Sequence, residues 1–212
     1  MTGTGLGDRR LYLCTADRPD LAGFLAACIA GGVDVVQLRD KVLDARPLLT
    51  RARLAASVCR DLGVPFILND RPDLALESGA GGVHVGQNDG PPALARRILG
   101  PDAIVGLSTH APAELDAAGG EPVDYVSVGP VAPTPTKPGR PGTGLGYLGY
   151  AAAAAAATAR PWFVTGGVTP ETVVPMLDAG ARRFVVVRWL TEAADPGAAA
   201  RALRAVIDRV PL

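Results

Sequence analysis

Short apolar runs alternate with amphipathic segments along the whole chain, and this alternation predicts the elements of the fold. The apolar runs are rich in β-branched residues and have the length of strands, whereas the segments between them have helical spacing. Strands are expected at residues 11–14, 33–39, 65–69, 82–86, 103–108, 124–130, 162–167 and 184–189. Helices are expected at residues 20–32, 45–63, 72–80, 91–100, 111–120, 151–157, 169–180 and 195–210.

The repeated strand–helix order predicts an α/β fold, a single (β/α)₈ barrel (TIM barrel) that spans residues 1–212 as one domain. Strands this continuously apolar are covered on both faces, which is typical of a parallel sheet. An open, doubly wound sheet is the alternative. Its dinucleotide-binding version is disfavoured because no Gly-x-Gly-x-x-Gly motif follows the first strand.

Composition narrows the class of protein. The 212 residues are 48% hydrophobic and 20% charged, with a formal net charge of zero, so the composition gives no indication of nucleic acid binding. The beginning of the sequence has no apolar leader, and the alanine run at 151–157 is too short to cross a membrane. Three scattered cysteines favour a reducing compartment. We therefore expect a cytoplasmic protein, and the sequence leaves a homo-oligomer open.

Polar residues gather where the predicted strands end, which is the face that carries chemistry in such barrels. Gln37, Arg39 and Lys41 alternate along one extended segment, so they share one face. They could be a strand that runs into a solvated turn. If that face points inward, an anionic ligand would offset the cost of the buried cations.

Asp70 and Asp89 follow two adjacent predicted strands and admit two interpretations. Each could cap the helix that comes after it. Together they could bind Mg²⁺, which keeps several waters and bridges phosphate oxygens. Spacing alone leaves both interpretations open.

A second anion site is expected after the last strands, where such barrels commonly hold phosphate. Gly166 and Gly167 precede a helix that should begin at Thr169 with Pro170 in its first turn. His84 lies inside a strand and is expected to be packed or hydrogen bonded. We find no nucleophile and acid partner that would make a hydrolase of Ser108 and His110.

Five segments in a fixed order resemble the thiamine phosphate synthase family: VVQLRDK, LNDRPDLALESGAGGVHVGQND, GLSTH, DYVSVGPVAPTPTKPGRPGTGL and TGGVTPETV. The resemblance covers nearly the whole chain and implies a (β/α)₈ barrel. It also implies a transferase that joins an aminopyrimidine diphosphate to a thiazole phosphate, releasing pyrophosphate and thiamine phosphate, with Mg²⁺ as cofactor.

The resemblance implies a role for individual residues. The pyrimidine diphosphate would contact Gln37, Leu38, Arg39, Asp40, Lys41, Asn69, Ser108 and Lys137. Mg²⁺ would be held by Asp70 and Asp89, and the thiazole phosphate by Thr134, Pro135, Thr136, Gly167, Val187 and Arg188. The candidate catalytic residues would act by charge and hydrogen bonding rather than as acid, base or nucleophile: Arg39, Lys41, Ser108 and Lys137.

The proline-rich segment at 129–148 would then be a lid over two phosphorylated substrates, which excludes water from a reactive intermediate. The departure from the family pattern that matters most is Arg188, which stands where a serine is frequent and is followed by Trp189 and Leu190 where small residues are common. Three alternatives stay open: a thiazole tautomerase that uses His110, a non-catalytic sensor of a phosphorylated ligand, and a phosphosugar isomerase or epimerase. The last would need a general base at a strand end, and none is evident.

Overall fold

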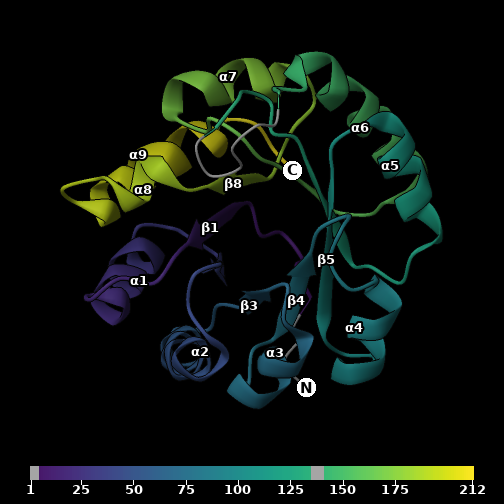
Figure 1. Cartoon of the computed structure of the whole chain (residues 1–212). Coiled ribbons are helices and arrows are strands. Elements are labelled where there is room, and N and C mark those ends of the chain that lie inside the picture. The colour runs from purple at the N-terminus through teal and green to yellow at the C-terminus, as the bar shows by residue number, and fades with distance from the viewer. Residues whose placement is uncertain (1–4, 135–140) are drawn as a thin grey trace.

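A computed structural model describes residues 5–134 and 141–212, and these residues form the closed parallel barrel that the alternating pattern predicts. The strands follow one another in chain order, and β8 pairs with β1 to close the ring. Figure 1 shows the helices arranged around the outside of the strands. The strands are β1 (Leu11–Thr15), β2 (Val35–Leu38), β3 (Phe66–Asn69), β4 (Gly82–Val85), β5 (Ile104–Thr109), β6 (Tyr125–Val128), β7 (Trp162–Val164) and β8 (Phe184–Val186).

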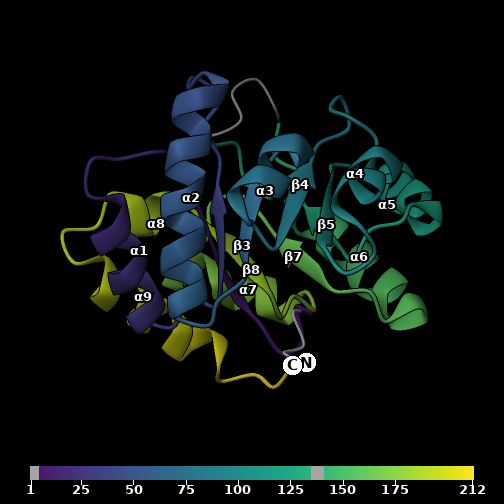
Figure 2. The ribbon, with the colours of Figure 1, turned by 90° about the horizontal axis from the view of Figure 1, so that it is seen from below.

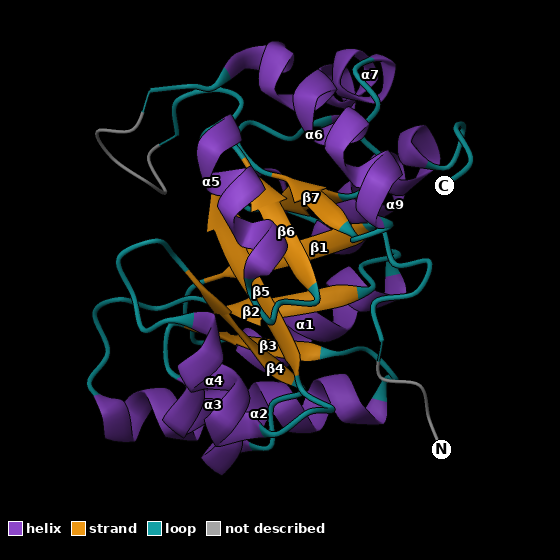
Figure 3. Ribbon diagram, turned by 90° about the vertical axis from the view of Figure 1, so that its right-hand side faces the viewer, coloured by secondary structure: helices purple, strands orange, loops and turns teal. Residues whose placement is uncertain are grey.

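Helices connect the strands and cover their outer faces. Neighbouring helices contact one another, as α1, α2, α3 and α4 do along one side of the barrel (Figures 2 and 3). The helices are α1 (Leu21–Ala30), α2 (Ala45–Asp61), α3 (Pro72–Ser78), α4 (Pro92–Leu99), α5 (Pro112–Ala117), the 3₁₀ turn η1 (Ala118–Gly120), α6 (Gly144–Thr158), α7 (Pro170–Asp178), α8 (Arg188–Thr191) and α9 (Pro196–Ile207). None of the helices within the described ranges combines the length and the apolar character needed to span a bilayer.

The strands separate two hydrophobic cores because successive side chains point to opposite faces. Leu11 and Leu13 of β1 face the larger core beneath the helices, whereas Tyr12 between them faces the barrel interior. The interior cluster consists of Leu6, Tyr12, Val35, Ile67, Ile104, Tyr125 and Phe163. Its large side chains fill the barrel toward the amino ends of the strands, so a ligand can enter only toward the carboxyl ends.

Two glycines make room for this interior packing. A Cβ atom on Gly106 would lie 2.2 Å from Cζ of Tyr125, and one on Gly82 would lie 2.0 Å from the carbonyl oxygen of Ile104. Both distances are far shorter than van der Waals contact. The Tyr125 ring therefore lies directly over Gly106 and packs edge-on against Phe163, with 5.5 Å between ring centroids.

Several predicted boundaries are wrong, including the end of β7, which was expected at residue 167 and lies at Val164. Arg188 and Trp189 begin the short helix α8 instead of ending a strand, and β2 stops at Leu38, so Arg39 and Lys41 lie in the loop after it. Helix α6 begins at Gly144, well before the alanine run, although glycines are poor helix formers. Tertiary packing outweighs propensity there, because Tyr147 and Leu148 in its first turns are buried.

Candidate active site

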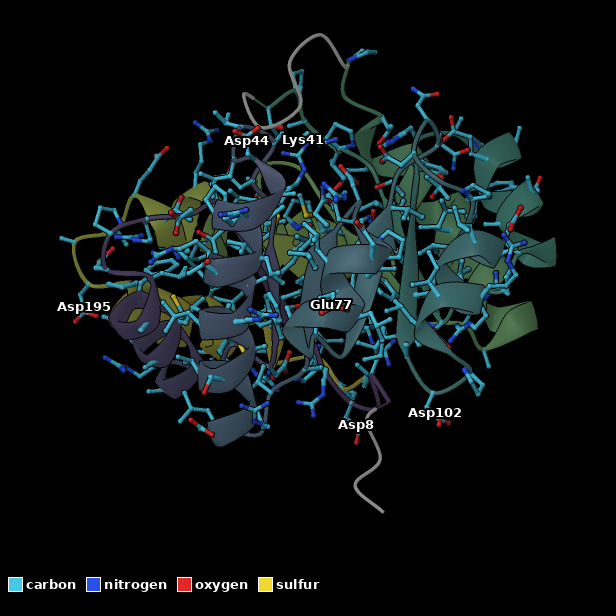
Figure 4. All side chains as sticks on the ribbon, turned by 60° about the horizontal axis from the view of Figure 1, so that its bottom comes forward. Asp8, Lys41, Asp44, Glu77, Asp102 and Asp195 are labelled. Carbon is cyan, nitrogen blue, oxygen red and sulfur yellow. The ribbon has the colours of Figure 1, made fainter. Side chains whose placement is uncertain are left out.

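A cavity of about 370 Å³ opens among the residues at the carboxyl ends of the strands. This volume lies within the range of small-molecule sites, about 300–1,000 Å³. Figure 4 shows Lys41 at this end of the barrel, with Asp8 and Asp102 at the opposite end. The position agrees with the face where barrels of this type bind their substrates.

The cavity brings together most of the side chains that the sequence singles out. The predicted residues that line it are Gln37, Arg39, Lys41, Asn69, Asp70, Asp89, Ser108, Thr134, Gly167, Val187 and Arg188. Leu38 and Asp40 are not among the lining residues. Pro135, Thr136 and Lys137, which the resemblance also assigns to the site, lie outside the described residues.

Leu38 and Asp40 have structural surroundings that explain their absence from the lining. The Leu38 side chain points outward into the core beneath the helices. The Asp40 carboxylate accepts hydrogen bonds from the amides of Asp17, Val42 and Leu43, so it holds the turn after β2 together. The alternation along residues 37–41 therefore directs only the odd-numbered side chains to the cavity.

Asp70, Asp89 and Lys41 form a charged cluster on the rim. Lys41 Nζ lies 2.7 Å from Oδ2 of Asp70, and the Asp70 and Asp89 carboxyl groups are close enough for each to shift the pKa of the other. The backbone of Asp70 is in the left-handed region with φ of 63°, a conformation that Asp tolerates better than most residues. The amide of Asp70 donates to the carbonyl of His84, which ties the end of β3 to β4.

The two carboxyl groups have opposite pKa shifts. Burial, together with the neighbouring charge of Asp89, raises the pKa of Asp70, and Lys41 opposes that rise. For Asp89, burial acts to raise the pKa, but the neighbouring Asp70 carboxyl and the hydrogen bond from the Gly86 amide outweigh it and lower the pKa. Two like charges this close are costly, so the pair favours a bound proton or a cation.

The structure contradicts helix capping as the role of these two aspartates. Arg71 is the N-cap residue of α3 and Pro91 that of α4, and neither helix has a side-chain cap. The Asp89 carboxylate instead accepts from the amide of Gly86 at 2.8 Å, inside its own loop.

The carboxylate pair suits a hard divalent cation such as Mg²⁺. Mg²⁺ usually takes one or two protein carboxylates and completes its shell with water and phosphate oxygens. Within the described ranges, no group of three or more His, Cys, Asp or Glu side chains is arranged to hold a metal ion. Asp70 and Asp89 would therefore be the protein ligands, and the rest of the shell would come from solvent and substrate.

The opposite wall of the cavity comes from the last two strands. It includes Gly167 after β7 and Val187 and Arg188 after β8, with Thr134 from the loop that follows β6. Helix α7 begins here as predicted, because Thr169 caps it by accepting from the Thr172 amide and Pro170 occupies its first turn. Gly166 has a positive φ, and a Cβ there would lie 2.6 Å from Cβ of Pro130. This close packing holds the β6 and β7 loops together.

Arg39 and Arg188 bring positive charge to the two sides of the cavity. Among the residues that the structure describes, neither guanidinium forms an ion pair, whereas Lys41 is paired with Asp70. Guanidinium groups bind phosphate oxygens through paired N–H donors. Each of the two sides of the cavity therefore has a positively charged side chain that can bind an anion.

Sequence reasoning missed the polar layer at the bottom of the cavity. Tyr12, Cys14, Tyr125 and Ser127 line it together with His84, which is hydrogen bonded inside the barrel as expected. The two tyrosines belong to apolar runs and look like core residues in the sequence. Their alternation within β1 and β6 was the available signal, since it places both side chains on the face opposite the outer core.

Comparison with known proteins places the chain among enzymes of thiamine synthesis. A family profile described as thiamine monophosphate synthase matches residues 11–190. A thiamine-phosphate synthase of Mycobacterium sp. (strain JLS) is 47% identical over 220 residues, covering 98% of this chain and 96% of the relative. One of Thermobifida fusca is 51% identical over 204 residues, covering 94% and 92%.

A solved structure supports the same assignment. A thiamine phosphate pyrophosphorylase from Pyrococcus furiosus superposes with a TM-score of 0.85 at 25% sequence identity, covering 95% of this chain and 96% of the other. The profile match and the near-complete coverage of the relatives confirm the resemblance noted in the sequence. The chain belongs to the thiamine monophosphate synthase family.

Proposed function

We propose that the cavity joins an aminopyrimidine carrying a diphosphate to a thiazole carrying a phosphate, as a thiamine phosphate synthase. The bond from the pyrimidine methylene carbon to the diphosphate oxygen breaks, and pyrophosphate leaves with the bonding electrons. The ring nitrogen of the thiazole then forms a bond to that carbon. The products are thiamine phosphate and pyrophosphate.

One observation carries the proposal within this family: the Asp70–Asp89 pair and Lys41 lie on one side of a cavity whose other side holds Arg188. The reaction needs positive charge for a departing diphosphate and a separate site for a second phosphate. A barrel mouth with charged groups on both sides meets both needs.

Arg39 and Lys41 would stabilise the leaving diphosphate. Charge develops on its oxygens as the bond breaks, and fixed cations lower the barrier most when they face that charge. Lys41 is already oriented by Asp70, and Arg39 has no competing ion pair in the described part of the chain. Lys137, which lies outside the described residues, is expected to add a further cation.

Asp70 and Asp89 would hold Mg²⁺, which when bound supplies positive charge to the diphosphate oxygens. The two aspartates are thus assigned to binding the metal and not to proton transfer. The two carboxyl groups are close enough for Asp89 to raise the pKa of Asp70, which is consistent with a site whose charge is balanced by a cation.

Gly167, Val187, Arg188 and Thr134 would hold the thiazole phosphate on the other side. Holding the two substrates side by side turns a bimolecular reaction into an effectively unimolecular one, which can supply much of the rate increase. An amino group on the pyrimidine stabilises the positive charge left by the diphosphate, so no strong general base is needed. His110 does not take that role in this proposal, since its ring Nδ1 contacts the carbonyl of Gly129.

The test is to mix both phosphorylated heterocycles with the protein, with and without Mg²⁺, and to measure pyrophosphate and thiamine phosphate. We expect equal amounts of the two products, dependent on Mg²⁺. Release of pyrophosphate without thiamine phosphate would overturn the proposal, and the absence of any turnover would overturn it in favour of a sensor. The similarity to thiamine-phosphate synthases does not favour a thiazole tautomerase. A cytoplasmic location and a homo-oligomer stay predictions.

A further inference from the structure

A chain of buried hydrogen bonds crosses the barrel interior beneath the cavity. Gln37 Nε2 lies 2.7 Å from the Tyr12 hydroxyl, and the hydroxyls of Tyr12 and Tyr125 are 2.9 Å apart. The Tyr125 hydroxyl is 2.9 Å from His84 Nδ1, and His84 Nε2 is 2.8 Å from Ser108 Oγ. This chain, from Gln37 through both tyrosines and His84 to Ser108, links two predicted substrate-binding residues on opposite sides of the barrel.

The direction of the chain follows from the number of hydrogens that each group has. The Cys14 thiol donates to Gln37 Oε1, so the amide nitrogen of Gln37 faces Tyr12 and donates to it. Tyr12 has one hydrogen, and its other partner in the described residues is Tyr125. If Tyr125 also donated to Tyr12, the Tyr12 hydrogen would be buried without an acceptor there, which costs free energy. Tyr12 therefore donates to Tyr125.

Counting hydrogens in the same way gives the direction of the remaining hydrogen bonds, from Tyr125 to the cavity. Tyr125 accepts from Tyr12, so its own hydrogen goes to His84 Nδ1. An imidazole that accepts at Nδ1 carries its hydrogen on Nε2, and that hydrogen is directed to Ser108 Oγ. Burial raises the pKa of Tyr12 and Tyr125, so both keep the hydrogens that the chain requires.

The hydrogen-bond chain reaches the cavity at Ser108, which is one of the lining residues. Its Oγ accepts from His84, and the Ser127 hydroxyl approaches as a second donor at 3.4 Å. With His84 and Ser127 as donors, Ser108 Oγ is the acceptor in both contacts, so its own hydrogen is directed to neither of these two groups. A serine held in this way presents a donor, which suits an acceptor such as a pyrimidine ring nitrogen or a diphosphate oxygen.

We propose that His84 and Tyr125 are positioning residues of this enzyme. The chain holds His84 as the Nε2–H tautomer, and His84 fixes Ser108 as a hydrogen-bond donor to the pyrimidine diphosphate. The part that concerns the substrate rests on the proposed function. The tautomer of His84 does not depend on the proposed function, so the tautomer and the effect on the substrate can be tested separately.

The tautomer of His84 can be measured directly because the protein has only two histidines, His84 and His110. Long-range proton–nitrogen correlation spectra of the full, ¹⁵N-labelled protein at neutral pH distinguish the two neutral forms and the doubly protonated ring. His110 Nδ1 faces a carbonyl, so His110 should be the Nδ1–H form. The His110→Gln variant removes that signal and assigns the other. We expect Nε2–H for His84; the Nδ1–H form or a doubly protonated ring would overturn the proposal.

Kinetics test whether the chain acts through Ser108. Tyr125→Phe removes one hydroxyl and keeps the ring, and it should raise KM for the pyrimidine diphosphate about 2- to 12-fold, the range for one neutral hydrogen bond. KM for the thiazole phosphate should not change. In a Ser108→Ala background the same change should have less than about a twofold effect, since the residue it acts through is gone. Equal effects in both backgrounds, or on both Michaelis constants, would refute the positioning role.

Tyr147→Phe is the matched control. It also removes a largely buried tyrosine hydroxyl with two hydrogen bonds, to Thr109 Oγ1 and the Ala111 carbonyl, but it lies outside the barrel interior. We expect Tyr147→Phe to leave the His84 spectrum unchanged. If Tyr125→Phe does not fold by circular dichroism, the wild-type spectrum still decides the tautomer. If the wild type shows no turnover, the proposed function fails, but the His84 spectrum still tests the hydrogen-bond chain.

Discussion

The Asp89→Asn substitution tests the assignment of the carboxylate pair most sharply. It removes one negative charge from the pair but keeps a side-chain oxygen of the same size in the same place. That oxygen can still accept the hydrogen bond that Asp89 receives from the Gly86 amide at 2.8 Å. The substitution therefore separates the charge of Asp89 from its part in the loop structure.

The structure sets the expected magnitudes. Loss of charge assistance in the Gly86 hydrogen bond should cost about 1 kcal/mol, and relief of the repulsion from Asp70 should offset it. The free energy of unfolding should thus change by less than about 1 kcal/mol. Turnover should fall about 10²- to 10³-fold, the usual loss when one group that stabilises developing charge is removed.

The assay is steady-state release of pyrophosphate at saturating substrates over a range of Mg²⁺ concentrations, with urea unfolding of the same samples. We expect lower turnover and a higher Mg²⁺ requirement. Asp73→Asn is the control, because it removes a carboxylate paired with Arg71 on the surface of α3. The reasoning is refuted if Asp89→Asn keeps turnover within about threefold of the wild type, or if it loses stability as strongly as activity.

Three further predictions concern other parts of the molecule. Arg188→Ala should raise KM for the thiazole phosphate about tenfold or more and leave that for the pyrimidine diphosphate unchanged; equal changes in steady-state kinetics would contradict the two-sided site. Gly106→Ala should lower the free energy of unfolding in urea by about 1–3 kcal/mol, because its Cβ would meet the Tyr125 ring, whereas Gly119→Ala, which has open space, should not. Stability should fall by about 1.4 kcal/mol per thiol between pH 8 and 10 for Cys28 and Cys59. Burial raises the pKa of each thiol to about 12 from 9.0, so between pH 8 and 10 only the unfolded protein loses these protons. Urea unfolding midpoints that rise over this pH range would contradict the prediction.

The barrel was predictable because its strands are short apolar runs with a helix after each. Every predicted strand overlaps an observed one, and the boundaries failed where tertiary packing decides. Arg188 and Trp189 continue an apolar run in the sequence, yet Val187 leaves the extended conformation with ψ of −91° and α8 begins. Nothing in the local pattern marks that turn.

Alternation and strand-end position predicted the rim of the site better than its interior. Gln37, Arg39 and Lys41 line the cavity as their spacing suggests, and Asp70 and Asp89 meet because β3 and β4 are neighbours. The ion pair of Lys41 with Asp70 could not be predicted, since it depends on how two loops approach.

The interior chain depends on contacts between distant parts of the sequence. The hydroxyls of Tyr12 and Tyr125 are hydrogen bonded although 113 positions separate the residues. In the sequence each tyrosine is indistinguishable from an ordinary core aromatic. Closure of the barrel, which brings β1 and β6 to face each other across the interior, is what gives them polar partners.

The most direct test of the account is a crystal structure of the protein with pyrophosphate and Mn²⁺ in place of Mg²⁺, because the anomalous signal of manganese locates the metal. We predict manganese between the Asp70 and Asp89 carboxylates, with pyrophosphate oxygens on the metal and on the Arg39 and Lys41 side chains. Manganese absent from this pair, or pyrophosphate bound away from Arg39 and Lys41, would contradict the central claim.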